Sequence, residues 1–289
     1  MGNFVHLHLH TEYSLLDGAA RIKRIAEKAK ADGQTAVAIT DHGVMYGAVE
    51  FYDEMKKNGI KPIIGCEVYV AQRSRLEKNG KSDSSGNHLI LLCKNEIGYK
   101  NLCYMVSESF VNGFYMKPRI DMELIRNHHE GLIALSACLA GKIPQLILAG
   151  SMQEAEKYAL EMREIFGDDF YLEIQNHGMD DQKKVAFGIK LISEKYGIPM
   201  VATNDVHYVD RNDADTQATL LCIQTNNVIT DGRPFGFEGN EFYFKTEREM
   251  MQLFAGYEGA LENTVKIAEK CNFDFDFDKL HLPDFKSEQ

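Results

Sequence analysis

The chain has 289 residues, 44% of them hydrophobic and 26% charged, so it is not a largely disordered protein. Its net charge of −11 argues against a broad basic surface that would hold DNA or RNA by counterion release alone. A phosphate substrate is still allowed, because bound divalent cations can reverse the local sign of charge.

Apolar, β-branched runs alternate along the chain with segments of helical period, a pattern typical of βα units around a parallel sheet. Seven such strands with crossover helices predict an α/β fold, either a barrel or a nearly closed sheet. The runs predict strands near residues 3–9, 36–40, 62–70, 88–93, 132–137, 170–175 and 199–203. Helices are expected near 20–32, 47–58, 98–110, 121–127, 140–148, 151–166, 181–196, 246–255 and 258–270.

Two stretches depart from this alternation. Residues 73–86 are polar and almost free of apolar side chains, which predicts a mobile surface loop. Residues 231–240 predict an irregular excursion before the last two helices. The length fits either two domains or one large barrel. The final residues carry no strong signal for the end of a domain, so the chain is expected to be the front part of a longer protein.

The six cysteines show no CxxC pair or regular close spacing, which indicates reduced thiols rather than a disulfide framework. The N-terminus enters the first predicted strand without a signal peptide. No apolar run approaches the roughly 18 residues of a membrane-spanning helix. We therefore expect a cytoplasmic protein with no membrane partner.

The first predicted strand is rich in histidine. Alternation on a strand would place Val5, Leu7 and Leu9 in a core and the three histidines of the same stretch, His6, His8 and His10, on the opposite face. Neutral imidazole is the commonest metal ligand, so the pattern predicts metal binding. A half-buried strand with a histidine-rich polar face explains this segment alone equally well.

Further ligand-type residues occur at or beside the other strands, where barrel enzymes build their active sites. Glu67 lies inside an apolar strand, where a carboxylate is costly to bury unless it is paired or coordinated. His88 is at the start of a predicted strand and, taken alone, is interpreted as a residue at the strand's edge. Cys138, taken alone, is interpreted as a small side chain of the core. Asp205 and His207 repeat the two-residue spacing of His8 and His10. Together these donors suit zinc, or a mixed site with manganese or iron.

These residues carry a family resemblance. The motifs His8-x-His10, Thr40-Asp-His42-Gly and Asp205-x-His207, with Glu67, His88 and Cys138, resemble the polymerase and histidinol phosphatase (PHP) superfamily. More narrowly, residues 4–18, 61–67 and 202–208 look like the N-terminal domain of bacterial replicative DNA polymerase III alpha subunits. The resemblance covers essentially the whole chain, including residues 226–285, which simple phosphatases of the superfamily lack.

The resemblance implies a distorted seven-stranded, TIM-like (β/α)7 barrel with three divalent metals at the C-terminal ends of its strands. By this carry-over, His8, His10, Glu67 and Asp205 hold one metal. Glu67 bridges to a second metal held with His88 and Cys138, and a third is held by Asp17, His42 and His207. Zinc is the metal expected first. The resemblance also implies a PHP barrel over residues 1–225 and a C-terminal extension over 226–289. The extension is expected to belong to the same compact unit and to lead toward a polymerase core.

A site of this kind suits hydrolysis of a phosphate ester, because a metal-bound water can ionise near a pKa of about 7. We expect Glu67, Asp205 and His207 to be catalytic together with that water. Asp41, which could orient His42 by a hydrogen bond, and His177, which follows the sixth strand, form a second tier. A loop histidine in solvent is an equal alternative for His177, and His6 is expected to be a neighbour of the site rather than a ligand.

The leading functional hypothesis is a metal-dependent 3′–5′ exonuclease that proofreads for a replicative polymerase. Its partners would be a single-stranded or mismatched DNA 3′ end, the remaining polymerase domains and other replisome subunits. A small-molecule phosphatase of the histidinol-phosphatase type would use the same ligands. A third hypothesis is a structural and interaction module whose metals stabilise the fold.

Overall fold

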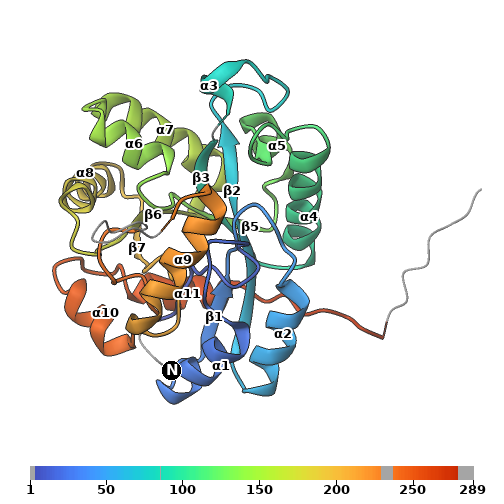
Figure 1. Ribbon diagram of the computed structural model, residues 1–289. Helices are drawn as coiled ribbons and strands as arrows, with labels where there is room; N and C mark the ends of the chain where they lie inside the picture. The colour runs from blue at the N-terminus through green and yellow to red at the C-terminus, as the bar shows by residue number, and fades with distance from the viewer. Residues whose placement is uncertain (1–3, 85, 229–236, 279–289) are drawn as a thin grey trace, which may run out of the picture.

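The computed structural model describes residues 4–84, 86–228 and 237–278 (Figure 1). Its strands are β1 (Ala36–Ile39), β2 (Lys61–Ala71), β3 (Gly86–Cys93), β4 (Arg119–Ile120), β5 (Leu132–Leu135), β6 (Phe170–Ile174) and β7 (Met200–Ala202). Its helices are α1 (Ile22–Ala31), α2 (Ala48–Lys57), α3 (Gly80–Asp83), α4 (Glu96–Val111), α5 (Met122–His128), α6 (Lys142–Leu148), α7 (Met152–Phe166), α8 (Asp180–Tyr196), α9 (Ala214–Thr225), α10 (Glu247–Leu253) and α11 (Glu262–Lys270).

The strands form one curled sheet in the order β1-β2-β3-β5-β6-β7, with β4 paired to β2. The N-terminal segment lies between the two ends of this sheet. His6 forms a parallel bridge to Val37 of β1, and Leu9 forms one to Val206, just after β7. The backbone N–H of His10 donates to the carbonyl of Val206 at 2.7 Å. The distorted seven-stranded barrel expected from the sequence is confirmed.

One strand runs against the expected direction. β3 is antiparallel to both β2 and β5, whereas the remaining strand pairs are parallel, so the prediction of a parallel sheet is wrong at this point. The start of β3 therefore lies at the same edge of the sheet as the ends of its neighbours. His88, opposite Tyr69 in the register, is for this reason at the edge where the other ligand-type residues gather.

The N-terminal segment does not keep the strict alternation that its sequence predicts. The chain bends at His8. Before the bend, Val5 and Leu7 belong to the cluster that fills the barrel, while Leu9, after it, belongs to the cluster between barrel and helices. His6 packs against Phe244, with ring centroids 4.1 Å apart. The bend shifts the phase by one residue, so the three histidines do not share one face.

The interior of the barrel is filled by aliphatic side chains from the strands and from α11. Ile267, Ala268 and Cys271 join Val5 and Leu7 in this inner cluster. The hydroxyl of Thr264, also on α11, accepts a hydrogen bond from the backbone N–H of Val5 at 2.9 Å. A larger cluster packs the outer helices against the strands. α11 therefore closes one end of the barrel, and the ligand-type residues lie at the other.

Residues 73–84, predicted as a mobile surface loop, lie at the surface and are hydrogen-bonded to the side chain of Arg119. The side chain of Arg119 is fully buried and donates to the carbonyl oxygens of Arg75, Glu77, Asp83 and Gly113. A fixed guanidinium fork can satisfy several acceptors at once. This segment also contains the short helix α3.

The predicted helices agree with the structure, and capping residues mark the starts of three of them. Asn95 accepts from the backbone N–H of Gly98 at the start of α4, and Asp121 does the same for Leu124 in α5. Thr246 and Glu249 form a capping box on α10. The sequence predicted neither β4, α9 nor the short helix α3. The strand predicted near residues 3–9 forms only isolated bridges in its described part. Residues 231–236 of the predicted irregular excursion lie outside the described part of the chain. Among the described helices, none is long and apolar enough to cross a membrane.

Candidate metal centre

The structure brings all of the predicted ligand residues to one end of the barrel. His8 and His10 come from the N-terminal segment, and Asp17 comes from the loop that follows it. Glu67 lies in the middle of β2 and His88 near the start of β3. The remaining residues lie on loops that follow strands: His42 after β1, Cys138 after β5, and Asp205 and His207 after β7.

Glu67 is the centre of this arrangement and is fully buried. Its Oε1 atom lies 3.3 Å from His8 Nε2, 2.9 Å from His88 Nδ1 and 4.0 Å from Cys138 Sγ. Its Oε2 atom contacts His42 Nδ1. Burial opposes the charged carboxylate, but the surrounding histidines outweigh it and hold the pKa of Glu67 well below its usual value. The carboxylate thus has one oxygen on each side of the cluster, as a bridging ligand would.

Asp205 faces the first two histidines. Its Oδ1 atom lies 3.1 Å from the Nε2 atoms of both His8 and His10, which are themselves 3.1 Å apart. The residue adopts a left-handed backbone conformation with φ of 46°. A non-glycine residue in this region is uncommon and costs energy, although Asp tolerates it better than most. The turn directs the carboxylate into the cluster.

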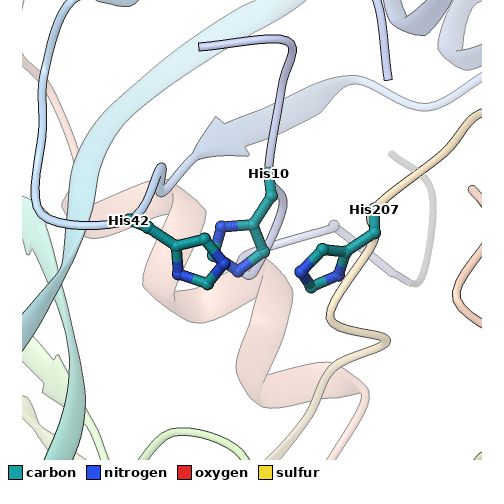
Figure 2. Close-up of side chains that lie close together, drawn as sticks. All are labelled: His10, His42 and His207. Carbon is teal, nitrogen blue, oxygen red and sulfur yellow. The ribbon is translucent and has the colours of Figure 1, made fainter. Parts of the chain in front are cut away.

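His10, His42 and His207 present their rings to one another (Figure 2). One nitrogen of each ring lies within 4.8 Å of the others. His42 Nε2 lies 3.2 Å from Asp17 Oδ2, and His207 Nε2 lies 3.8 Å from Asp17 Oδ1. The predicted third set of Asp17, His42 and His207 is therefore assembled. His10, assigned to the first metal, borders this third set as well.

The donor atoms fit a metal centre. His8 Nδ1 lies 2.6 Å from the carboxylate of Glu173, so this nitrogen carries a proton. Burial opposes charge on the ring, but Asp205 and Glu173 raise the pKa of His8 well above its usual value, so a metal bound at Nε2 would displace a proton from that nitrogen. Asp205 Oδ1 and His207 Nε2 are buried and lack a well-formed hydrogen bond within the described chain. Buried polar atoms normally have hydrogen-bond partners. A cation would provide the missing partner for these converging oxygen and nitrogen atoms.

The electrostatics show how tightly these groups are coupled. Burial lowers the pKa of His10 to about 3, and the neighbouring His42 and His207 add to that effect. Burial also opposes charge on His42, but the carboxylates of Glu67 and Asp17 raise its pKa to about 10. Burial raises the pKa of the Cys138 thiol well above its ordinary value. A thiolate at this position would need a cation beside it.

Sequence reasoning missed Glu173 on β6. Besides contacting His8, its Oε1 atom accepts hydrogen bonds from the Thr203 hydroxyl and from the Gln175 amide. The side chain is 1% exposed. The signal was present in the sequence, since Glu173 interrupts an apolar strand just as Glu67 does, and a buried carboxylate requires partners.

The second-tier residues have structural roles. Asp41 accepts hydrogen bonds from the backbone and hydroxyl of Thr11 and from the hydroxyl of Ser14. Ser14 Oγ in turn accepts from the backbone N–H of His42 and lies 3.3 Å from His10 Nδ1. Asp41 thus supports His42 through Ser14 rather than by touching its ring.

His177 is not a loop histidine in solvent, because it is only 5% exposed. Its Nε2 donates to the carbonyl of Asn204 at 2.9 Å, and its Nδ1 accepts from the Gln182 amide at 2.7 Å. The ring also stacks on Phe242. His6 points away from the cluster, and its Nε2 donates to the carbonyl of Lys245 at 2.8 Å. Neither ring forms a hydrogen bond to the side chain of a candidate ligand in the described chain.

Two cavities open beside the cluster. The first, of about 260 Å³, has ligand residues on its floor and walls that include Met179, Phe237 and Phe242. The second, of about 240 Å³, shares Asp17 and His42 with the first. Most of the candidate ligands therefore border the first cavity, and Asp17 and His42 border both.

The chain is similar in sequence to several proteins whose names are known. The chain is 48% identical over 287 residues to a protein of Borreliella burgdorferi named DNA polymerase III subunit alpha, a match that covers 98% of this chain and 25% of that protein. It is 47% identical over 278 residues to a protein of the same name from Thermus aquaticus, over 94% of this chain and 23% of that one. The chain thus spans about a quarter of the length of these relatives.

Among solved structures, the chain is similar to an amidohydrolase from Chromobacterium violaceum, with 14% identity and a TM-score of 0.46 over 86% of this chain and 96% of that one. It is also similar to a two-domain protein from Bacteroides vulgatus that is described as containing a predicted PHP-like metal-dependent phosphoesterase. There the identity is 13% and the TM-score 0.41, over 90% of this chain and 62% of that one. The family model of the PHP domain matches residues 6–177, more than half of the chain. The chain therefore belongs to the PHP domain family.

Proposed function

We propose that this chain is a metal-dependent phosphoesterase that removes nucleotides from the 3′ end of a DNA strand. The observation that carries the proposal is the convergence of the whole donor set around Glu67, at one end of the barrel and beside two cavities. The names of the curated relatives add the link to DNA replication. The natural context would then be proofreading within a polymerase III alpha subunit.

The chain's own residues would prepare the site for hydrolysis. His8, His10, Glu67 and Asp205 would hold one divalent metal, Glu67, His88 and Cys138 a second, and Asp17, His42 and His207 a third, with zinc expected first. When bound, such ions supply an ionised water near neutral pH and stabilise charge on the phosphate oxygens. Glu173 fixes the tautomer of His8, and Glu67, Asp205 and His207 border the place where the phosphate would lie.

The direct test is shortening of a DNA strand labelled at its 3′ end, with metal content measured on the same sample. We expect release of the terminal nucleotide, its loss on chelation, and its abolition in His8→Ala and Asp205→Ala. Glu156→Gln, on the outer helix α7, is the control and should retain activity. Removal of the metal with undiminished nuclease activity would refute the proposal.

The same experiment separates the two rival functions. Turnover of small phosphomonoesters without cleavage of DNA would favour a small-molecule phosphatase. Bound metal with no hydrolysis of any phosphate ester would favour a structural and interaction module. One observation supports such a module. The relatives are about four times as long as this chain, so the matching part of each relative has further domains to contact.

The division of the chain also belongs to this proposal. We assign residues 1–225 to the phosphoesterase barrel and 226–289 to an extension that leads toward a polymerase core and its replisome partners. The described part of this extension is attached to the barrel through α11. A cytoplasmic location follows from the same context.

A further inference from the structure

The second cavity beside the cluster is lined by other types of residue than the first. Its lining includes the rings of Tyr13, Tyr46, Tyr69 and Phe110 and the ammonium group of Lys117. Among the described residues that line the first cavity, none is a lysine or an arginine. Only the second cavity therefore offers both flat aromatic surfaces and a cation, and we call it the tyrosine groove.

The tyrosine groove is continuous with the candidate ligands. Asp17 and His42 form part of its wall, and the ring of Tyr69 lies 6.3 Å from that of His42 at an interplanar angle of 25°. Lys117 Nζ lies 5.4 Å from the centroid of the Tyr69 ring. An aromatic ring and a positive charge therefore lie together beside the candidate ligands.

Large apolar side chains are exposed in the groove and on the loop after α4, where the ring of Phe114 lies 6.1 Å from that of Phe110. Tyr46 is 61% exposed and Phe110 is 38% exposed, and Phe114 and Met116 on the loop after α4 are 49% and 71% exposed. Exposed apolar side chains that gather in one place indicate a binding surface. An exposed aromatic surface that adjoins the candidate ligands Asp17 and His42 favours a polymeric substrate over a small one.

We propose that the tyrosine groove is the track for a single-stranded nucleic acid. Nucleobases stack on Tyr46 and Phe110, Lys117 contacts a backbone phosphate, and the strand ends at the candidate metal ligands. Stacking on aromatic side chains tolerates any base sequence, which a terminal exonuclease requires. This inference rests on the proposed function, because it names how the polymeric substrate of the same site is held.

The acidic balance of the chain is consistent with such a track. With a net charge of −11 and a single lysine in the groove, phosphate contacts contribute little and stacking contributes most of the affinity. Binding should therefore depend only weakly on salt. Lys117→Ala should reduce the slope of log affinity against log salt by about one contact.

The test is binding of a fluorescein-labelled oligodeoxythymidylate of about ten nucleotides to the 289-residue chain, followed by fluorescence anisotropy in a chelating buffer. Chelation prevents degradation, so the readout does not require catalysis. We expect Tyr46→Ala and Phe110→Ala each to weaken binding about fivefold or more, the lower range for loss of one stacked base. Phe187→Ala, which removes a 65% exposed ring from α8 on the other side of the molecule, should have no effect (Figure 1).

A second ligand distinguishes stacking from general damage. An oligonucleotide of the same length with abasic sites offers phosphates but no bases, so Phe110→Ala should not weaken its binding, whereas Lys117→Ala should. Groove variants that bind the normal oligomer within twofold of the unaltered chain would overturn the proposal. Failure of the unaltered chain to bind any oligomer would also overturn it.

The outcome is independent of the proposed activity. If the oligomer binds through the groove but the metal-loaded chain never shortens it, the nucleic-acid track is supported and the exonuclease activity is refuted. If the chain shortens DNA and the groove variants bind and cleave it as well as the unaltered chain does, the exonuclease activity is supported and the track is refuted.

Discussion

A single buried carboxylate decides which nitrogen of His8 is available to a metal. Glu173 accepts from Nδ1 at 2.6 Å and leaves Nε2 to face Glu67, Asp205 and His10. Carboxylates that hold a metal-binding histidine in this way raise the basicity of the ring and fix its orientation. The affinity of the site for metal should therefore depend on a residue that is not a ligand.

The first prediction is a loss of metal affinity in Glu173→Gln. Glutamine keeps the size of the side chain but removes its charge, so we expect zinc affinity to fall by about 10-fold to 100-fold with the fold retained. Titration of the metal-free chain with Zn²⁺ against a competing indicator would measure it. Glu156→Gln, which removes a surface carboxylate that accepts from Lys195, is the matched control. Equal affinity in both variants would contradict the orienting role of Glu173.

The second prediction concerns acid stability and His177. Burial lowers the pKa of its ring to about 4, below an unfolded value of about 6.5, because a second proton has no acceptor next to Gln182. The unfolded chain thus binds the proton more tightly. The contribution of His177 to stability is present above pH 6.5 and is lost as the pH falls toward 4.

At pH 5 this loss amounts to about 2 kcal/mol relative to pH 7. Denaturant unfolding at both pH values, in chelating buffer, would measure it. In His177→Gln the free energy of unfolding should fall by about that much less between pH 7 and pH 5 than in the unaltered chain. An identical pH dependence in the two proteins would show that His177 does not titrate as its burial requires.

At the scale of the elements, α11 closes the barrel. Ile267 is fully buried in the inner cluster, although it lies more than 60 residues after β7 in the chain. Ile267→Ala should lower the free energy of unfolding by about 2–5 kcal/mol, because it leaves a cavity in the packed interior. The exposed Glu269 on the same helix supplies the comparison. Urea denaturation should find Glu269→Ala nearly neutral, and an equally small effect of Ile267→Ala would exclude α11 from the core.

Arg119 has a comparable role for residues 73–84. Its guanidinium group satisfies four backbone carbonyl oxygens, and a lysine ammonium group cannot reach them all. Arg119→Lys should cost about 2 kcal/mol or more, because buried acceptors lose their donors. It should also expose residues 73–84 to limited proteolysis. Arg126→Lys, at a half-exposed surface pair, is expected to leave the digestion pattern unchanged; cleavage at the same rate in both variants would argue against the anchor.

At the scale of the whole molecule, the barrel and its candidate metals should be thermodynamically linked. Several of the converging carboxylates and imidazoles lack hydrogen-bond partners, which lowers the stability of the folded chain. A bound cation would offset that loss of stability. Each metal present at 100 times its Kd adds about 2.7 kcal/mol to the free energy of unfolding. We therefore expect the Tm to fall on chelation and to recover on addition of Zn²⁺. An unchanged Tm would mean that the cluster holds no metal tightly.

The sequence by itself predicted the barrel, most of its helices and the residues that converge. Hydrophobic period and capping residues are local properties, and the family motifs mark positions that the fold must bring together. Metal-ligand roles remain a prediction. The sequence also carried a signal for Glu173 that was not used, since a carboxylate in an apolar strand needs partners wherever it occurs.

Only the tertiary structure decided the direction of β3, the bend at His8 and the closure of the barrel by the N-terminal segment and α11. Strand direction depends on which neighbour a strand pairs with, and neither periodicity nor composition encodes that choice. The bend follows from contacts of His6 with Phe244 and Lys245, which lie more than 230 residues away in the chain. Contacts of such separation form because the whole chain packs, and so they could be read only from the folded molecule.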